Sequence, residues 1–353
     1  MHFNFPVFKT KMGSNRKFRL EDPADRVKYF NYKAGLEIKK IKKYLDKNTF
    51  VAFLLGKKNS GKGTYSKLFM EAVGKDKVAH ISVGDIVRSV HADLKDSKKK
   101  KSLIDFLKHR YRGFISIEKA IDVILGRDTV TLLPTEIILA LVEREIDRLG
   151  RKAIFIDGFP RNLDQVSYSL YFRALMGYRD DPDFMVFISV PDSVIDERIK
   201  NRVICPICKT PRSLKLLRTK EIGYDEKTKQ FFLKCDNPEC KEVRMVPKEG
   251  DELGIEPIRE RIEIDDKIGL KLLDLQGIPK VYLRNSIPVS VAKKSVDDYE
   301  LTPAYRYEKK GKDIRVVEEP WVIKDDEGKP AHSLLPAAVT VSLIKQIAKV
   351  LSL

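Results

Sequence analysis

The stretch LLGKKNSGKGTYSKLF (residues 54–69) joins an apolar run to a glycine-rich turn and then to residues typical of a helix. Such a turn directs backbone N–H groups and the positive end of the helix into one concavity, where a phosphate fits. The phosphate-loop pattern, Gly, four residues and then Gly-Lys, runs from Gly56 to Lys62. One extra glycine stands between Lys62 and the hydroxyl residue Thr64. The sequence therefore predicts a phosphate-binding loop, with a chance glycine turn as the alternative.

Short apolar runs alternate with amphipathic stretches on both sides of this loop. Strands are predicted at residues 50–55, 78–83, 153–156, 183–190 and 280–286, and helices at 27–45, 119–125, 135–149, 192–202 and 258–275 as well as from residues 64, 85, 162 and 336. This alternation predicts an α/β fold, in which a parallel sheet is covered by helices on both faces and the phosphate lies at the carboxyl ends of the strands. Near the end of the chain, DDEG (residues 325–328) is a candidate hairpin turn. SKKKKS (residues 97–102) is interpreted as a solvated lysine run, with a phosphate-binding role as the alternative.

The charge balance favours polyanionic partners. The 353 residues carry a net charge of +17, and the first 50 contain 13 basic and 5 acidic side chains. A solvated basic helix would explain that N-terminal excess equally well. No apolar stretch approaches the ~20 residues of a membrane span, and the first residues lack the apolar core of a signal peptide. We therefore expect a cytoplasmic protein with no membrane partner. A monomer is the expected state, although no motif determines it.

All four cysteines fall in one short segment, as CPIC and CDNPEC. The two pairs are Cys205 with Cys208 and Cys235 with Cys240. This is the ligand spacing of a closed structural Zn²⁺ site, and four thiolates can complete its tetrahedron. Disulfides are the alternative, but they are unusual in a reducing compartment.

Charged residues recur where the predicted strands end or helices begin. Asp157 ends the run AIFID and suits a Mg²⁺ ion held through water. Arg161 and Gln165 are four residues apart on the helix predicted to follow, so they share one face. Arg198 and Arg202 are also four apart and lead directly into the cysteine segment.

With these pieces in order, the chain resembles the adenylate kinases of the nucleoside monophosphate kinase family. The motifs that carry the resemblance are GKGT, GDIVR, DGFPRNLDQ, RIKNRVICPIC and IRERI. The resemblance implies a kinase core at residues 49–294, with a monophosphate-binding arm at about 88–134 and a zinc lid at about 203–257. Residues 1–48 and 295–353 would then be N- and C-terminal extensions.

The resemblance also implies roles for individual residues. ATP would be bound by Asn59, Ser60, Gly61, Lys62, Gly63, Thr64, Arg198 and Arg202, with Mg²⁺ served by Thr64 and Asp157. The acceptor monophosphate would be bound by Val83, Arg88, Asp157, Arg161, Gln165 and Arg261. The catalytic set would be Lys62, Arg161, Arg202 and Arg261, because phosphoryl transfer depends on positioned positive charge. Arg261 is chosen over Arg259, since residues two apart on a helix cannot both face the site.

The identity of the acceptor base depends mainly on Gln165. A side-chain amide can pair with an adenine edge, which favours AMP and hence the conversion of ATP and AMP into two ADP. Asn162 resembles the UMP/CMP kinase branch instead, and Val83 stands where a Thr or Ser is usual. A lid arginine has no clear counterpart upstream of IRERI: either Arg244 or Lys248 replaces it, or the contact is missing. A nucleic-acid-binding protein that retains the kinase frame is the other alternative.

Overall fold

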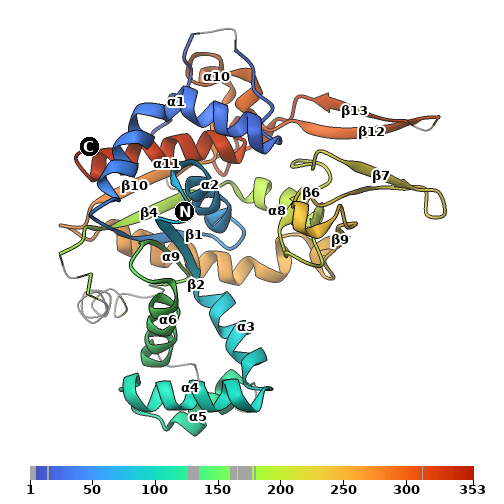
Figure 1. Cartoon of the computed structure of the whole chain (residues 1–353). Helices are drawn as coiled ribbons and strands as arrows, with labels where there is room; N and C mark the ends of the chain where they lie inside the picture. The colour runs from blue at the N-terminus through green and yellow to red at the C-terminus, as the bar shows by residue number, and fades with distance from the viewer. Residues whose placement is uncertain are drawn as a thin grey trace.

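The computed structural model describes residues 5–13, 16–125, 135–159, 165, 177–178, 180–311 and 313–353 (Figure 1). Among the helices of these ranges, none has both the length and the apolar character needed to cross a bilayer. The description that follows concerns these residues.

A five-stranded parallel sheet forms the centre of the structure, which confirms the predicted fold class. The strands lie in the order β10-β4-β1-β3-β2. Leu54 of β1 pairs with Asp157 of β3, and Asp157 pairs with Ser82 of β2. The carboxyl ends of these strands therefore meet at one edge of the sheet, where the phosphate loop begins. The bounds are β1 Val51–Gly56, β2 Val78–Ser82, β3 Ala153–Asp157, β4 Asp183–Ser189 and β10 Lys280–Arg284.

Helices cover both faces of the sheet, because successive strand residues point to opposite sides. Leu54 and Phe155 belong to a core shared with α1, α2 and α11, whereas Phe53 and Ile156 pack with α6. The first and last helices of the chain therefore cover the same face, next to each other (Figure 1). The helix bounds are α1 Pro23–Tyr44, α2 Lys62–Val73, α6 Thr135–Leu149, α8 Asp192–Lys200, α9 Arg259–Leu273 and α11 Pro336–Val350.

An arm of three helices leaves the sheet edge after β2 and projects away from it (Figure 1). These helices are α3 Val83–Asp93, α4 Ser97–Arg110 and α5 Ile117–Ile124. The lysine run forms the first turns of α4, whose N-cap is Asp96, and it is solvated as predicted. Its lysines are exposed because Leu103 and Leu107 supply the buried face.

The cysteine segment forms small antiparallel units. One sheet has the order β6-β5-β9, and β7 pairs with β8 as a hairpin. Their bounds are β5 Arg202–Ile204, β6 Pro211–Ser213, β7 Ile222–Asp225, β8 Gln230–Leu233 and β9 Val246–Pro247, with short 3₁₀ turns η1 Pro238–Cys240, η2 Asp251–Leu253 and η3 Glu256–Ile258. We call residues 202–258 the lid segment.

The segment after β10 packs against both the lid segment and the core. A long hairpin of β12 and β13 lies beside the lid segment (Figure 1). There the Tyr307 hydroxyl donates to the Leu214 carbonyl at 2.6 Å, and the Tyr305 N–H donates to the Lys215 carbonyl at 2.7 Å. The DDEG turn joins the antiparallel strands β14 and β15, which confirms it as a hairpin turn. The bounds are β11 Ser286–Pro288, α10 Val289–Ser295, η4 Asp298–Glu300, β12 Ala304–Lys310, β13 Asp313–Glu319, β14 Ile323–Lys324 and β15 Pro330–Ser333.

Candidate active site

The phosphate loop lies between β1 and α2, where its backbone can approach a ligand closely. Asn59 and Gly61 have positive φ angles of 66° and 99°, and both residue types tolerate that region. The Ser60 N–H donates to the Lys57 carbonyl at 3.1 Å, which closes the first turn of the loop. Lys62 begins α2 and donates its Nζ to the carbonyls of Gly56 (2.7 Å) and Lys57 (3.0 Å). The loop is therefore folded around the lysine that the motif places in it.

Gly56 is required by packing as well as by conformation. Its φ is +155°, and a Cβ at this position would lie 2.8 Å from the backbone oxygen of Ile188 on the neighbouring strand. The backbone of β4 thus lies closer to Gly56 than a residue with a side chain would allow.

Asp157 occupies the end of β3, level with the start of the loop. Its Oδ1 lies 3.8 Å from the Lys62 Nζ, and Thr64 lines the same cavity. A strand-end carboxylate beside a hydroxyl is a donor set that fits Mg²⁺ bound largely through water. Thr64 and Asp157 are the residues that would hold such an ion.

A cavity of about 1080 Å³ opens above the loop. This volume is slightly above the usual range for ligand pockets, about 300–1,000 Å³. Cationic side chains reach it from the loop, the arm, α8, the lid segment and α9. They include Lys58, Lys62, Arg88, Arg198, Arg202, Arg212 and Arg261. Separate elements therefore bring positive charge to one concave site, which suits a polyphosphate.

Arg202 connects the lid segment to the phosphate loop. Its guanidinium donates two hydrogen bonds to the Asp251 carboxylate, each of 2.6 Å, and a third to the Asn59 side-chain oxygen at 3.0 Å. Bidentate carboxylate pairs of this kind are strong and oriented. The same two N–H groups can bind a phosphate when it replaces the Asp251 carboxylate.

Two further predicted arginines line the cavity, each held by a neighbour. Arg261 donates to Asp265 at 2.9 Å, and Asp265 also accepts the Lys58 backbone N–H at 3.1 Å. Arg198 donates to the buried Asn285 side chain at 3.2 Å. Arg259 instead pairs with Glu256 at 3.1 Å and is not among the described residues around the cavity.

The residues predicted to bind the acceptor differ in where they lie. Arg88 lines the cavity from α3 and forms an exposed ion pair with Asp85. Val83 is buried in the core. Gln165 is buried as well, and its amide donates to the Thr135 hydroxyl at 3.1 Å. Arg161, like Asn162, lies outside the described residues, so the role of each stays a prediction.

The sequence reasoning missed Lys58, the third residue of the loop. Burial lowers the pKa of the Lys58 ammonium, and positive neighbours lower it further, namely Lys248, Arg202 and Arg261. Lys248 therefore lies near the cations of the cavity. Arg244, the other candidate for the missing lid arginine, is paired with Asp225 at 2.7 Å and packs over Phe232. The run of lysines in GKKNSGK was the available signal for Lys58.

The four cysteines come together in the lid segment. Their Sγ atoms all lie within 4.8 Å of one another, and Cys205, Cys235 and Cys240 are buried. None of the four forms a disulfide, and the Cys208 and Cys235 sulfurs are 3.6 Å apart. Sulfurs bound tetrahedrally at ~2.3 Å from Zn²⁺ would have separations of that order. The cluster therefore fits a closed structural zinc site.

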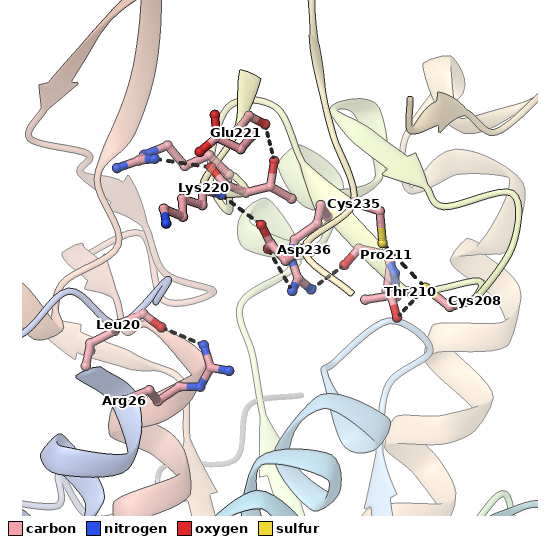
Figure 2. A network of polar contacts seen from close by, with 12 residues as sticks. Leu20, Arg26, Cys208, Thr210, Pro211, Lys220, Glu221, Cys235 and Asp236 are labelled. Carbon is pink, nitrogen blue, oxygen red and sulfur yellow. Dashed lines mark hydrogen bonds and ion pairs between the residues drawn. The ribbon is translucent and has the colours of Figure 1, made fainter. Parts of the chain in front are cut away.

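Polar contacts support the loops that carry these cysteines (Figure 2). The Thr210 hydroxyl lies 3.3 Å from the Cys208 sulfur. Asp236 follows Cys235 and accepts the Lys220 backbone N–H at 2.9 Å, while Arg212 lies 3.5 Å from the same carboxylate. Such outer contacts orient metal ligands.

Removing zinc is expected to lower the thermal stability. Treatment with a chelator, or Cys205→Ser, should lower Tm by about 5 °C or more, because the lid core is built around the metal ligands. Differential scanning calorimetry together with metal analysis, which should find one zinc per chain, tests this. Ile207→Ser is the matched control, since Ile207 lies between two ligands but is exposed. A metal-free protein with unchanged Tm would contradict the expectation.

A phosphate loop at the edge of a parallel sheet, facing a cavity lined by cations, defines a nucleotide-binding protein of the P-loop class. Comparisons with known proteins place it more closely. The family described as "AAA domain" matches residues 55–203. "Adenylate kinase" of Clostridium novyi is 31% identical over 225 residues, which cover 63% of this chain and 83% of that protein. The chain belongs to the nucleoside monophosphate kinase family.

Other relatives are matched over a smaller part of their length. "Adenylate kinase" of Kosmotoga olearia is 31% identical over 160 residues, 44% of this chain and 60% of that protein. "Probable UMP-CMP kinase 2" of Arabidopsis thaliana is 27% identical over 158 residues, 44% of this chain and 49% of that protein. The chain thus spans half to three fifths of the length of these two relatives.

Proposed function

We propose that the protein is an adenylate kinase, which transfers the terminal phosphoryl group of ATP to AMP and gives two ADP. The observation that carries the proposal is the convergence on one cavity of cations from the loop, the arm, α8, the lid segment and α9. A simple nucleotide-binding site needs the loop alone. Charge from so many elements suits a reaction in which two phosphorylated substrates meet end to end.

In the proposed mechanism, the loop amides and Lys62 bind the ATP phosphates. Arg88 and Arg161 bind the acceptor phosphate, and Arg202 and Arg261 stabilise the phosphoryl group in transit. In the structure Arg88, Arg202 and Arg261 form ion pairs with Asp85, Asp251 and Asp265 respectively. The substrate phosphates would replace these carboxylates. Mg²⁺, held near Thr64 and Asp157, would neutralise phosphate charge.

Closure of the lid segment would then exclude water, so that transfer to AMP is favoured over hydrolysis. Arg202 is suited to couple closure to binding, because it already bridges Asp251 of the lid segment and Asn59 of the loop. The zinc cluster would keep the lid segment rigid. The cytoplasm stays the predicted location and a monomer the predicted state.

The acceptor base is proposed to be adenine. The amide of Gln165 supports AMP, because it can pair with an adenine edge when it exchanges its hydrogen bond to the Thr135 hydroxyl for the base. The likeness to a UMP-CMP kinase supports a pyrimidine monophosphate as the alternative acceptor.

An assay of the purified, zinc-loaded protein with ATP and Mg²⁺ should show formation of ADP with AMP. We expect kcat/KM for AMP to exceed the values for UMP, CMP and GMP at least about tenfold, the discrimination that one missing base contact provides. Preference for UMP or CMP would favour the alternative acceptor. No ADP from any monophosphate, together with RNA binding that falls steeply with salt, would favour the nucleic-acid-binding alternative.

A further inference from the structure

Lys57, the residue that follows Gly56 in the phosphate loop, is a buried charge. Only 6% of its side chain is exposed, and its Nζ faces carboxylates from separate elements. These are Asp192 at the start of α8 (2.6 Å), Asp326 in the DDEG turn (3.3 Å) and Asp266 on α9 (3.6 Å). A buried ammonium of this kind is tolerated only when it is well paired.

Asp326 contacts α8 as well as the Lys57 ammonium. Its Oδ1 accepts the backbone N–H of Asp192 at 2.7 Å, so the same carboxylate caps α8. One residue on, the Ser193 hydroxyl donates to the Lys324 carbonyl at 2.8 Å. The turn itself is closed by the Gly328 N–H, which donates to the Asp325 carbonyl at 2.8 Å. The C-terminal segment is thus joined to both the loop and the helix that carries Arg198.

The backbone of Lys57 forms hydrogen bonds that hold the phosphate loop in shape. Its carbonyl accepts the Ser60 N–H at 3.1 Å and the Lys62 Nζ at 3.0 Å. A shift of the Lys57 side chain would therefore move the turn that presents the amides and the lysine to phosphate. Small displacements of positioned groups weaken binding and transfer strongly.

The charge of Lys57 is balanced by the three carboxylates around it. Burial alone would lower the pKa of the Lys57 ammonium, but the hydrogen bond to Asp192 and the charges of Asp326 and Asp266 outweigh it, and the pKa is raised. Asp266 is the weaker partner: burial raises its pKa, and its Oδ1 has no hydrogen-bond partner among the described residues. Asp192 and Asp326 are therefore the carboxylates that hold the ammonium by hydrogen bonds.

We propose that Asp326, in the segment that follows the kinase core, is a positioning residue of the phosphate loop and acts through Lys57 on the binding of the donor nucleotide. The proposal rests on the proposed function, since it takes the loop to be the ATP site. It makes the C-terminal segment a part of the donor half of the active site. The acceptor half, which lies on the arm side, does not depend on it.

The direct test is Asp326→Asn in the full chain, with ATP and AMP binding measured separately by calorimetry. The Kd of ATP should rise about tenfold, the effect of losing one charge-assisted hydrogen bond, and the Kd of AMP should stay unchanged. Asp326→Glu restores the charge and should recover most of the ATP affinity. Asp313→Asn is the matched control, because Asp313 is an exposed aspartate on β13 of the same segment. An unchanged Kd for ATP in Asp326→Asn would overturn the proposal.

A double-mutant cycle with Lys57→Met separates positioning from general stability. If Asp326 acts through Lys57, the losses of ATP affinity in the single variants will not add in the double variant. Additive losses, or equal losses of ATP and AMP binding that follow the fall in Tm, would indicate a structural role only and overturn the proposal. Should Lys57→Met fold poorly, Lys57→Arg supplies the second arm of the cycle. Because the readout is ATP binding, a wild-type protein that binds ATP but does not phosphorylate AMP would refute the proposed function and leave this test intact.

Discussion

Arg202→Ala is expected to lower kcat about a thousandfold, which is the lower end of the effect of removing an arginine that stabilises a transferred phosphoryl group. The Kd of ATP should change much less. In the structure the guanidinium is paired with Asp251. Replacing this carboxylate by a phosphate would therefore stabilise the transition state, in which charge develops, more than the bound ATP. Steady-state kinetics and calorimetry together separate the two effects.

Two companion variants sharpen the result for Arg202. Arg202→Lys should recover little activity, because a lysine cannot form the two parallel hydrogen bonds that Arg202 donates to the Asp251 carboxylate. Arg244→Ala is the matched control, since Arg244 belongs to the same segment but pairs with Asp225 and is not among the described residues around the cavity. Equal losses in Arg202→Ala and Arg244→Ala would show that the effect comes from disturbing the lid segment.

Lys62→Met should lower kcat/KM by about a hundredfold to a thousandfold, as expected for one preorganised donor to a developing charge. Methionine fills similar space but has no charge, so the two loop carbonyls that bind the Lys62 Nζ would also lose their donor. ATP binding should weaken, because Lys62 is the cation at the centre of the loop. A coupled assay and ATP calorimetry give both values.

Lys47→Met is the control for Lys62, because Lys47 is exposed and lies just beyond α1, outside the described lining of the cavity. Thermal unfolding should distinguish a binding defect from unfolding. Activity of Lys62→Met within a few-fold of the native value would be incompatible with a loop that binds the phosphates of the donor.

Much of the core could be predicted because its signals are local. Apolar runs of about five residues separated by helices allow few arrangements other than a covered parallel sheet. Gly56 and Lys62 could be predicted because the loop requires these residue types at this spacing. A glycine is needed where the chain passes close to Ile188, and a lysine is needed where the loop folds around its side chain. The two cysteine pairs are readable for the same reason, since metal ligands must occur at short, regular intervals.

Where the sequence reasoning missed structure, weak or competing signals explain the error. Helix α4 was missed because its lysine run hides a narrow apolar stripe, of which Leu103 and Leu107 are the buried members. Asp96 was an available helix-start signal. The hairpin of β12 and β13 was not predicted, although Gly311 lies at the turn between its two alternating runs.

The sequence alone determined the phosphate loop, the class of sheet and the cysteine cluster, because each depends on neighbours within one turn or on a short repeat. Only the tertiary structure decided that Lys57 is held by Asp326, that Arg244 is paired with Asp225, and that α1 and α11 cover one face of the sheet. A periodic pattern tells which side of an element is buried. It does not tell what will cover that side, because pairing between residues far apart in the chain depends on packing and desolvation summed over the whole fold.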